Sequence, residues 1–203
     1  GVDPKVMGKA AAMLCAEYGV AHIDLNFGCP VPKITRKGGG AALPWKSNLL
    51  AQILTETVKA TSGFNVPVTM KTRIGVDADH ITYLDAGHIA EETGCAAITL
   101  HGRTAAQHYS GKADWNAIAT LKQSINIPVF GNGDIWEAGD ALDMVEQTGC
   151  DAVVIGRGCL GRPWLFADLE AAFSGRVERA LPTLGEVAQI MKRHAELLGD
   201  WLG

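Results

Sequence analysis

Short apolar runs alternate with longer segments of helical periodicity along most of the chain. The runs cover residues 20–26, 66–73, 96–101, 127–132 and 151–156, and they are continuously apolar rather than alternating with polar residues. Such runs are typical of strands buried on both faces of a parallel sheet. Helical spacing of apolar residues predicts helices at 4–18, 47–61, 79–93, 114–124, 136–148 and 163–173. The pattern therefore predicts an α/β fold built from five strand–helix units.

Some of these units resemble one another. The stretch T-G-C-A-A-I-T-L-H at 93–101 matches T-G-C-D-A-V-V-I-G at 148–156, and N-V-P-V-T-M-K at 65–71 matches N-I-P-V-F-G-N at 126–132. A (β/α)8 TIM barrel consists of similar units, so the repetition favours a barrel over an open, doubly wound sheet. We expect residues 1–175 to form part of such a barrel.

The pattern changes near Gly175. A polar linker, S-G-R-V-E-R-A-L-P, precedes T-L-G-E at 183–186, which is a capping box for a final helix. That helix carries an apolar stripe, formed by Leu184, Val187, Ile190, Met191, Leu197, Leu198 and Trp201. Because nothing nearby in the sequence pairs with the stripe, residues 176–203 are expected to be a linker and the first helix of a second, helical domain.

Composition narrows the class of protein. Five cysteines at irregular spacing, with no C-x-x-C pair, argue against a disulfide framework and a zinc site and favour a reducing cytosol. No apolar run approaches the ~20 residues of a membrane span, and the first ten residues lack the apolar core of a signal peptide. We expect a cytoplasmic monomer without metal or membrane contact. The net charge of −4 by itself disfavours a nucleic-acid partner.

Polar residues follow the end of every predicted strand. They are Asn26 with Cys29, Lys71 with Arg73, His101 with Arg103, Asn132 with Asp134, and Gly156 with Arg157. Each pair alone is typical of a turn or a solvated charge. In a β/α barrel, however, the carboxyl ends of the strands meet at one face, where active sites lie. Five successive strands that each deliver polar groups there indicate a functional site.

Two of these loops suit a phosphate group. N-G-D-I (132–135) and G-R-G (156–158) follow the last two strands, where glycine lets the backbone approach an anion and Arg157 can pair with it. A phosphate there, with Lys71 two strands earlier, indicates a phosphorylated cofactor across the barrel mouth. Flavin mononucleotide (FMN) fits, since Lys71 would offset negative charge on its reduced ring.

Cys29 differs from the other cysteines in its local sequence, N-F-G-C-P. Gly28 and Pro30 force a sharp turn that exposes the thiol. The other four cysteines (Cys15, Cys95, Cys150 and Cys159) are expected to be small buried residues.

Five stretches in fixed order over residues 20–165 together resemble the tRNA-dihydrouridine synthases, most closely the bacterial B-type branch. They are I-D-L-N-F-G-C-P-V-P-K, V-T-M-K-T-R, I-T-L-H-G-R-T-A-A-Q-H-Y-S-G-K-A-D-W, V-F-G-N-G-D-I and V-I-G-R-G-C-L-G-R-P-W. The resemblance implies an FMN-binding TIM barrel followed by a helical tRNA-binding domain. It also implies tRNA as substrate and NADPH as reductant.

The resemblance assigns roles to individual residues. Cys29 would protonate uracil C5 while reduced FMN delivers hydride to C6, as suits a thiol whose ordinary pKa of ~8.5 leaves it protonated at neutral pH. Lys71 and His101 would contact the flavin and the edge of the uracil. The FMN phosphate would be held by Asn132, Gly133, Asp134, Gly156 and Arg157. Asn26 and Arg73 would line the substrate pocket, with Gln107 and Tyr109 at its rim.

The chain also departs from that family. A full barrel has eight strands, whereas five are predicted here, and residues 1–18 correspond to the helix after the third strand. The family's opening strand, which ends in A-P-M, has no counterpart. We therefore expect a fragment that holds the last five barrel units. Two alternatives stay open: an FMN barrel dehydrogenase acting on a free pyrimidine, similar to dihydroorotate dehydrogenases, or an inactive, truncated RNA-binding remnant.

Overall fold

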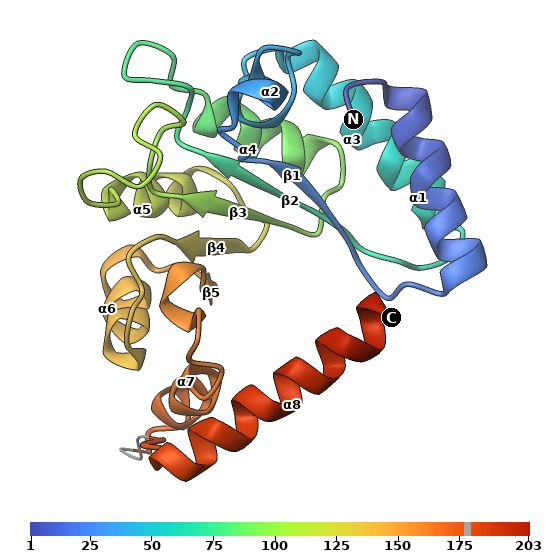
Figure 1. Ribbon diagram of the computed structural model, residues 1–203. Helices are drawn as coiled ribbons and strands as arrows, with labels where there is room; N and C mark the ends of the chain where they lie inside the picture. Colours follow the sequence, from blue (N-terminus) through green and yellow to red (C-terminus); the bar gives the residue numbers. More distant parts are fainter. Residues whose placement is uncertain (177–179) are drawn as a thin grey trace.

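The computed structural model describes residues 1–176 and 180–203. At its centre is a five-stranded sheet in which every strand pairs in parallel with the next one along the chain (Figure 1). The strands are β1 (Ile23–Phe27), β2 (Val68–Arg73), β3 (Ala97–His101), β4 (Val129–Asn132) and β5 (Ala152–Val154). This unbroken parallel order, with helices between the strands, is that of a partial TIM barrel.

The helices between the strands cover one side of the sheet. They are α3 (Ser47–Ser62), α4 (Tyr83–Glu92), α5 (Trp115–Ser124) and α6 (Ala138–Thr148), with α1 (Pro4–Tyr18) before β1 and α7 (Leu165–Phe173) after β5. Short helical turns follow β1, namely α2 (Pro32–Thr35) and η1 (Gly40–Ala42), and η2 (Arg157–Cys159) follows β5. The closeness of this packing is plain at Gly131, where an added Cβ would lie 2.4 Å from Sδ of Met144 in α6.

The two faces of the sheet differ in chemistry. Side chains that point toward the helices form the hydrophobic core, among them Leu25, Met70, Ile98 and Leu100. Successive residues of a strand point to opposite faces, so the residues between these four lie on the inner face. That face is polar: the Thr69 hydroxyl donates to the Asp24 carboxylate at 2.7 Å, and Asn26 and Lys71 lie opposite each other two residues further along the same two strands.

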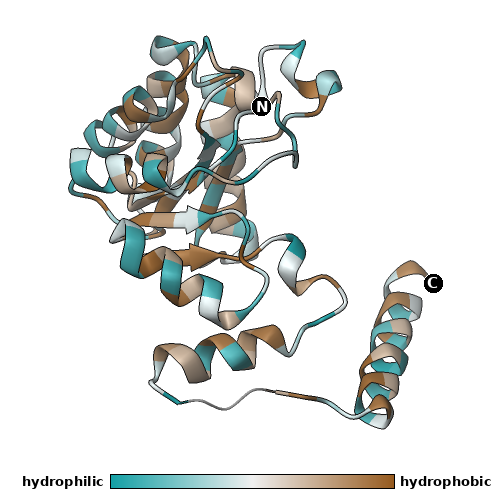
Figure 2. Ribbon diagram, turned by 90° about the vertical axis from the view of Figure 1, so that its left-hand side faces the viewer, coloured by the Kyte–Doolittle hydropathy of each residue, from teal (hydrophilic) through white to brown (hydrophobic). Residues whose placement is uncertain are grey.

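The last helix, α8 (Leu184–Leu202), stands apart from the sheet and its helices (Figures 1 and 2). The predicted capping box is present: the Thr183 N–H donates to Glu186 Oε2 at 2.7 Å, and the Glu186 N–H donates to Thr183 Oγ1 at 3.3 Å. None of the residues of α8 is buried, and Trp201 is 85% exposed. Residues 177–179 of the predicted linker lie outside the described residues, and the domain boundary at residue 175 stays a prediction.

All five predicted strands and the predicted helices are confirmed, most of them with shorter ends, whereas α1 has the predicted bounds and α3 extends one residue further, to Ser62. The helix expected at 79–93 begins later, at Tyr83, because residues 76–80 close a turn in which the Val76 N–H donates to the His80 carbonyl at 3.0 Å. The strand expected at 151–156 is reduced to Ala152–Val154, the residues that face β4 across the ladder.

The cysteine predictions hold with one exception. All five cysteines are free, and Cys15, Cys95 and Cys150 are buried. The prediction of a buried Cys159 is wrong, since it lies half-buried in η2, where its thiol donates to the Gly156 carbonyl at 3.1 Å. Within residues 1–176 and 180–203 there is no cluster of potential metal ligands and no helix long and apolar enough to cross a membrane.

Candidate functional site

A cavity of about 320 Å³ lies at the carboxyl ends of the strands. Its lining includes the ten residues predicted as catalytic, cofactor-binding or substrate-binding: Asn26, Cys29, Lys71, Arg73, His101, Asn132, Gly133, Asp134, Gly156 and Arg157. Gln107, expected at the rim, is not part of the lining, and its side chain accepts from the Thr104 N–H at 2.8 Å. The lining also includes Tyr109, which was expected at the rim, and Trp136, which was not predicted. The fold thus brings together in one place ten residues that are spread over the sequence from Asn26 to Arg157.

Strand register explains this convergence. Asn26 of β1 lies opposite Lys71 of β2, and one step further along the sheet Arg73, His101 and Asn132 form a continuous row across β2, β3 and β4. Residues two apart in a strand share a face, so both rows point to the inner side. The cavity is therefore lined by two layers of polar side chains.

The loop that carries Cys29 is held at both ends. The Gly28 N–H donates to Oδ1 of Asn26 at 3.0 Å, and the Ala41 N–H donates to the Cys29 carbonyl at 3.0 Å. Gly40 has a φ of 55°, and an added Cβ there would lie 2.4 Å from the Cys29 carbonyl oxygen, so glycine is required. These contacts fix the thiol at the cavity edge.

Arg73 joins this loop to the loop after β3. Its Nε donates to the Gly28 carbonyl at 2.9 Å, and its Nη1 donates to the carbonyls of Thr104 at 2.9 Å and His108 at 3.1 Å. Arg73 is only 4% exposed. Much of its hydrogen-bonding capacity is thus used within the protein, and its predicted contact with substrate stays a prediction.

Lys71 is an unpaired cation in the cavity. Within the described parts of the chain its ammonium has no hydrogen-bond or ion-pair partner. Burial and the nearby Arg73 guanidinium lower its pKa from 10.5 to about 8, against a smaller opposing effect of Asp24. At neutral pH the group remains mostly charged, so it is available to an anionic or electron-rich ligand.

His101 is neutral at physiological pH. Burial, followed by the charges of Arg73, Lys71 and Arg103, lowers its pKa from 6.5 to about 3. Its Nδ1 is buried and has no partner among the described residues. A neutral imidazole beside an unpaired ammonium suits the polar edge of a heterocycle, so these two residues fit a flavin.

The two predicted phosphate loops lie in direct contact. An added Cβ at Gly158 would sit 2.2 Å from the Ile135 carbonyl oxygen, so only glycine allows this approach. No acceptor within residues 1–176 and 180–203 takes the backbone N–H groups of Gly156, Arg157 and Gly158. Free N–H groups beside an arginine form an arrangement that binds phosphate, so this end of the cavity fits the phosphate of FMN.

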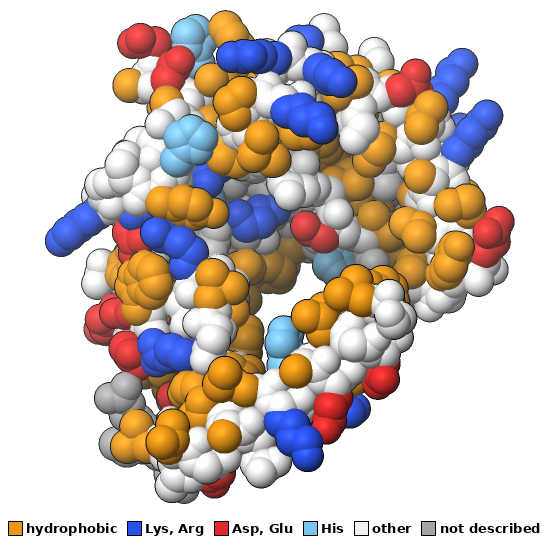
Figure 3. All heavy atoms as spheres, viewed as in Figure 1, with side chains coloured by type: hydrophobic (Ala, Val, Ile, Leu, Met, Phe, Trp, Pro, Cys, Tyr) orange, Lys and Arg blue, Asp and Glu red, His pale blue; other side chains and the backbone are white. Residues whose placement is uncertain are grey.

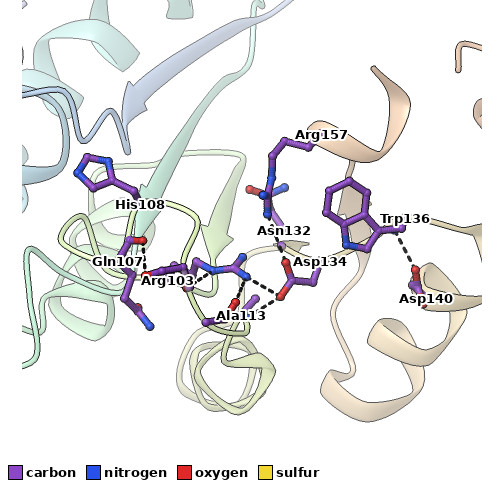
Figure 4. Close-up of polar contacts among 12 residues, drawn as sticks. Arg103, Gln107, His108, Ala113, Asn132, Asp134, Trp136, Asp140 and Arg157 are labelled. Carbon is purple, nitrogen blue, oxygen red and sulfur yellow. Dashed lines mark hydrogen bonds and ion pairs between the residues drawn. The ribbon is translucent and has the colours of Figure 1, made fainter. Parts of the chain in front are cut away.

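Side chains in these loops are less available than the sequence suggested. Asn132 donates through Nδ2 to the Val154 carbonyl at 2.7 Å, which ties β4 to β5. Oδ2 of Asp134 accepts from Arg103 Nη2 at 2.8 Å and from the Ala113 N–H at 2.7 Å (Figure 4). The backbone N–H groups and Arg157 are available to an anion at this end, and the contacts of Asn132 and Asp134 with a phosphate stay predictions.

Arg157 is held between two aromatic rings. Its guanidinium carbon lies 4.3 Å from the centroid of the Tyr109 ring and 5.0 Å from that of Trp136, and its Nη2 is 3.5 Å from Asp134 Oδ1. Figure 4 shows Arg157 reaching toward Asp134 beside the Trp136 ring. These contacts orient the guanidinium and leave N–H donors available to a ligand.

Arg103 was noted at a strand end but given no role. It is 2% exposed and donates to the carbonyls of Ser110 at 3.0 Å and Gly111 at 2.6 Å as well as to Asp134. It therefore fixes the loop after β3 against the loop after β4. The only sequence signal was an arginine within H-G-R-T, directly after a buried strand.

A family model for dihydrouridine synthases (Dus) matches residues 1–203, the whole chain. The chain belongs to the dihydrouridine synthase family. The match includes H-G-R-T and the segment that follows it, and it favours this family over the alternative of a barrel dehydrogenase acting on a free pyrimidine.

Curated relatives of this dihydrouridine synthase chain agree. A probable tRNA-dihydrouridine synthase of Mycobacterium leprae (strain TN) is 62% identical over 198 residues, which are 97% of this chain and 52% of that protein. A tRNA-dihydrouridine synthase B of Pasteurella multocida (strain Pm70) is 39% identical over 203 residues, which are 100% of this chain and 60% of that protein. The chain thus spans little more than half the length of the curated relatives it matches.

Solved structures support the fold. A histamine dehydrogenase from Rhizobium sp. 4-9 aligns with a TM-score of 0.59 at 15% identity, covering 86% of this chain and 28% of that one. A putative lyase/mutase from Burkholderia cenocepacia J2315 aligns with a TM-score of 0.57 at 18% identity, covering 95% and 66%. At such low identity these similarities show the architecture alone.

Proposed function

We propose that this chain carries the catalytic face of a tRNA-dihydrouridine synthase, which reduces a uridine of tRNA to 5,6-dihydrouridine with FMN as cofactor and NADPH as reductant. The observation that carries the proposal is the cavity itself, in a chain of this family: a loop thiol, an unpaired ammonium, a neutral imidazole and two glycine-containing loops with Arg157 line one space.

The residues would act at two ends of the cavity. Arg157 and the backbone of Gly156 and Gly158 would hold the phosphate of FMN, while Lys71 and His101 would lie along the ring. Reduced FMN would supply a hydride for uracil C6. The Lys71 ammonium would favour negative charge on its ligand, and the neutral His101 would offer a hydrogen bond without adding charge.

Cys29 would act as the general acid. Hydride addition at C6 leaves an electron pair at C5, which takes the thiol proton, so the residue ends the step as a thiolate and recovers its proton from water. The Arg73 guanidinium lies close enough to Cys29 to interact with it electrostatically and would stabilise that thiolate. Asn26, whose Oδ1 accepts from Gly28, would present its amide nitrogen to a uracil carbonyl.

The test uses the full protein, including any sequence that precedes or follows this chain in its gene. It measures the two half-reactions separately. Replacing Cys29 by alanine should leave flavin reduction by NADPH unchanged and slow the oxidation of reduced flavin by tRNA by about 10²- to 10⁴-fold, the usual contribution of a general acid. Stopped-flow absorbance of the flavin measures both steps.

Cys15→Ala provides the matched control, because it removes a free thiol of α1 that is not part of the cavity lining, and it should affect neither step. Equal losses in both half-reactions of Cys29→Ala would indicate structural damage. A folded wild-type protein that takes up no FMN would refute the flavin assignment and would favour the inactive-remnant alternative.

A further inference from the structure

The segment that follows Cys29 carries charged residues of one sign only. Between residues 25 and 55 the sequence has four basic residues and no acidic one, although the whole chain has a net charge of −4. The four are Lys33, Arg36, Lys37 and Lys46, and all of them are exposed. We call these four residues the basic segment.

The basic segment is held in a defined shape. The N–H groups of Thr35 and Arg36 donate to the carbonyls of Val31 and Pro32, and the Gly39 N–H donates back to the Ile34 carbonyl at 3.2 Å. Lys46 folds over the same loop, since its Nζ lies 2.8 Å from the position of an added Cβ on Gly38. The four cations are therefore displayed on one compact loop that begins at Cys29.

None of the four cations is neutralised by a described residue. Arginines and lysines elsewhere in the chain form ion pairs with carboxylates, as in Lys122 with Asp151 and Arg162 with Glu137, but no such pair involves the basic segment. In the loop after β2, Asp77 is bound to His80, whose ring centroid lies 4.1 Å from that of Trp45. Figure 3 shows the lysine and arginine side chains gathered over α2.

We propose that the basic segment binds the phosphodiester backbone of RNA beside the nucleotide that is presented to Cys29. Unpaired, ordered cations fit a partner with closely spaced negative charges, and the site next to them requires that a polynucleotide be brought to the thiol. The inference rests on the proposed function, and it places the contact with the RNA backbone on the loop that begins at Cys29. It also explains how a chain of net negative charge can bind a polyanion, because binding responds to local charge.

The experiment measures tRNA affinity as a function of salt. The protein is titrated with an unmodified tRNA transcript from 50 to 300 mM KCl, and the slope of log K against log salt is compared among variants. Each glutamine substitution in the basic segment should reduce the slope by roughly 0.7 to 0.9, and the quadruple variant K33Q/R36Q/K37Q/K46Q by about 3. The Michaelis constant for tRNA should rise with little change in kcat.

Lys59→Gln is the matched control. Lys59 lies in the last turn of α3, whereas Lys46 immediately precedes its first residue, so roughly 20 Å of helix separates them. The same charge is removed at the far end, and the slope should not change. Flavin reduction by NADPH should be normal in all variants, which shows that they are folded.

Three outcomes are decisive. A quadruple variant with the wild-type slope would overturn the inference while the proposed function stands. Equal effects of Lys59→Gln and Lys46→Gln would overturn it as well, because net charge rather than this loop would then be responsible. A wild-type protein that neither binds tRNA nor lets tRNA oxidise its reduced flavin would overturn the proposed function together with the inference.

Discussion

Two buried arginines illustrate how the cavity is built from single residues. Arg73 and Arg103 direct their guanidinium groups mainly to main-chain carbonyls of the loops around the cavity, at 2.6 to 3.1 Å. A carbonyl accepts such a charge-assisted hydrogen bond without itself adding charge. The loops are thereby fixed, and positive potential is left in the cavity. Burial is the largest cause of the lowered pKa of His101, and the positive charges around it lower that pKa further.

Lys71 provides a test at this scale. Its folded-state pKa of about 8 lies below the ordinary 10.5, so between these values the unfolded chain binds more protons and stability must rise with pH. Below about pH 8, Lys71 is charged in the folded protein, so burial of its ammonium lowers the free energy of unfolding by the full amount. The Lys71→Met variant should lack this rise and should bind flavin more weakly at pH 7. Urea unfolding from pH 7 to 10.5, beside flavin titration, measures both; parallel pH profiles of the two proteins would contradict the assignment.

The aromatic contacts of Arg157 provide a second test. If Tyr109 and Trp136 hold the guanidinium for a phosphate, Trp136→Leu should weaken FMN binding by about 3- to 10-fold, since a partly exposed cation–π contact contributes ~1 kcal/mol. Riboflavin, which lacks the phosphate, should bind as before, and Trp136→Phe should retain most of the affinity. Quenching of flavin fluorescence gives all six constants. Equal weakening of both flavins would assign the tryptophan to the ring instead.

At the scale of elements, the site depends on how closely two loops approach. Gly158 of η2 lies against the carbonyl of Ile135 in the loop after β4, with no room for a methyl group. Gly158→Ala must push these loops apart, at a cost of about 1–3 kcal/mol in the free energy of unfolding, and FMN affinity should fall with it.

The control for that substitution is Gly139→Ala in α6, where an added Cβ meets no atom within 4 Å. Alanine is the better helix former, so this variant should be equal to or up to ~1 kcal/mol more stable than the wild type. Thermal unfolding followed by circular dichroism compares the three proteins. A Gly158→Ala protein as stable as Gly139→Ala would show that the loops move freely.

Elements were more predictable from the sequence than the contacts between them. The apolar runs located the strands, and strand order alone placed Asn26, Lys71 and His101 at one face. The partners of Asp134 could not be predicted, because Arg103 and Ala113 meet it only when two loops from different units come together. The hydrogen bond from the Asn132 amide nitrogen to the Val154 carbonyl could not be predicted for the same reason, and the contact of Asn132 with a phosphate stays a prediction.

At the scale of the molecule, α8 stands out because none of its residues is buried against the sheet or its helices. Figure 3 shows its hydrophobic side chains on the side turned toward the hollow beneath the sheet, with charged side chains on the opposite side. Leu184, Met191 and Trp201 are each more than half exposed. The helix therefore depends on its capping box and its own periodicity rather than on burial in this chain.

Removal of α8 tests this view. A chain that ends at Pro182 should unfold at the same temperature as residues 1–203, because α8 buries none of its residues. It should lose helical signal in proportion to the 19 residues of α8 and should self-associate less, since an exposed apolar stripe is gone. Circular dichroism and sedimentation velocity measure these changes. A clearly lower melting temperature would mean that α8 packs on the sheet.

The in-register rows across β1 to β4 have a consequence for how this protein can change over time. A single-codon deletion inside Val68–Arg73 would turn the side chains beyond it to the opposite face of the sheet, so that Lys71 or Arg73 would point into the hydrophobic core. The same deletion between residues 76 and 80 would only shorten a surface turn. Changes of length are therefore better tolerated in this surface turn than within the strands, where a single lost residue reverses which side chains face the cavity.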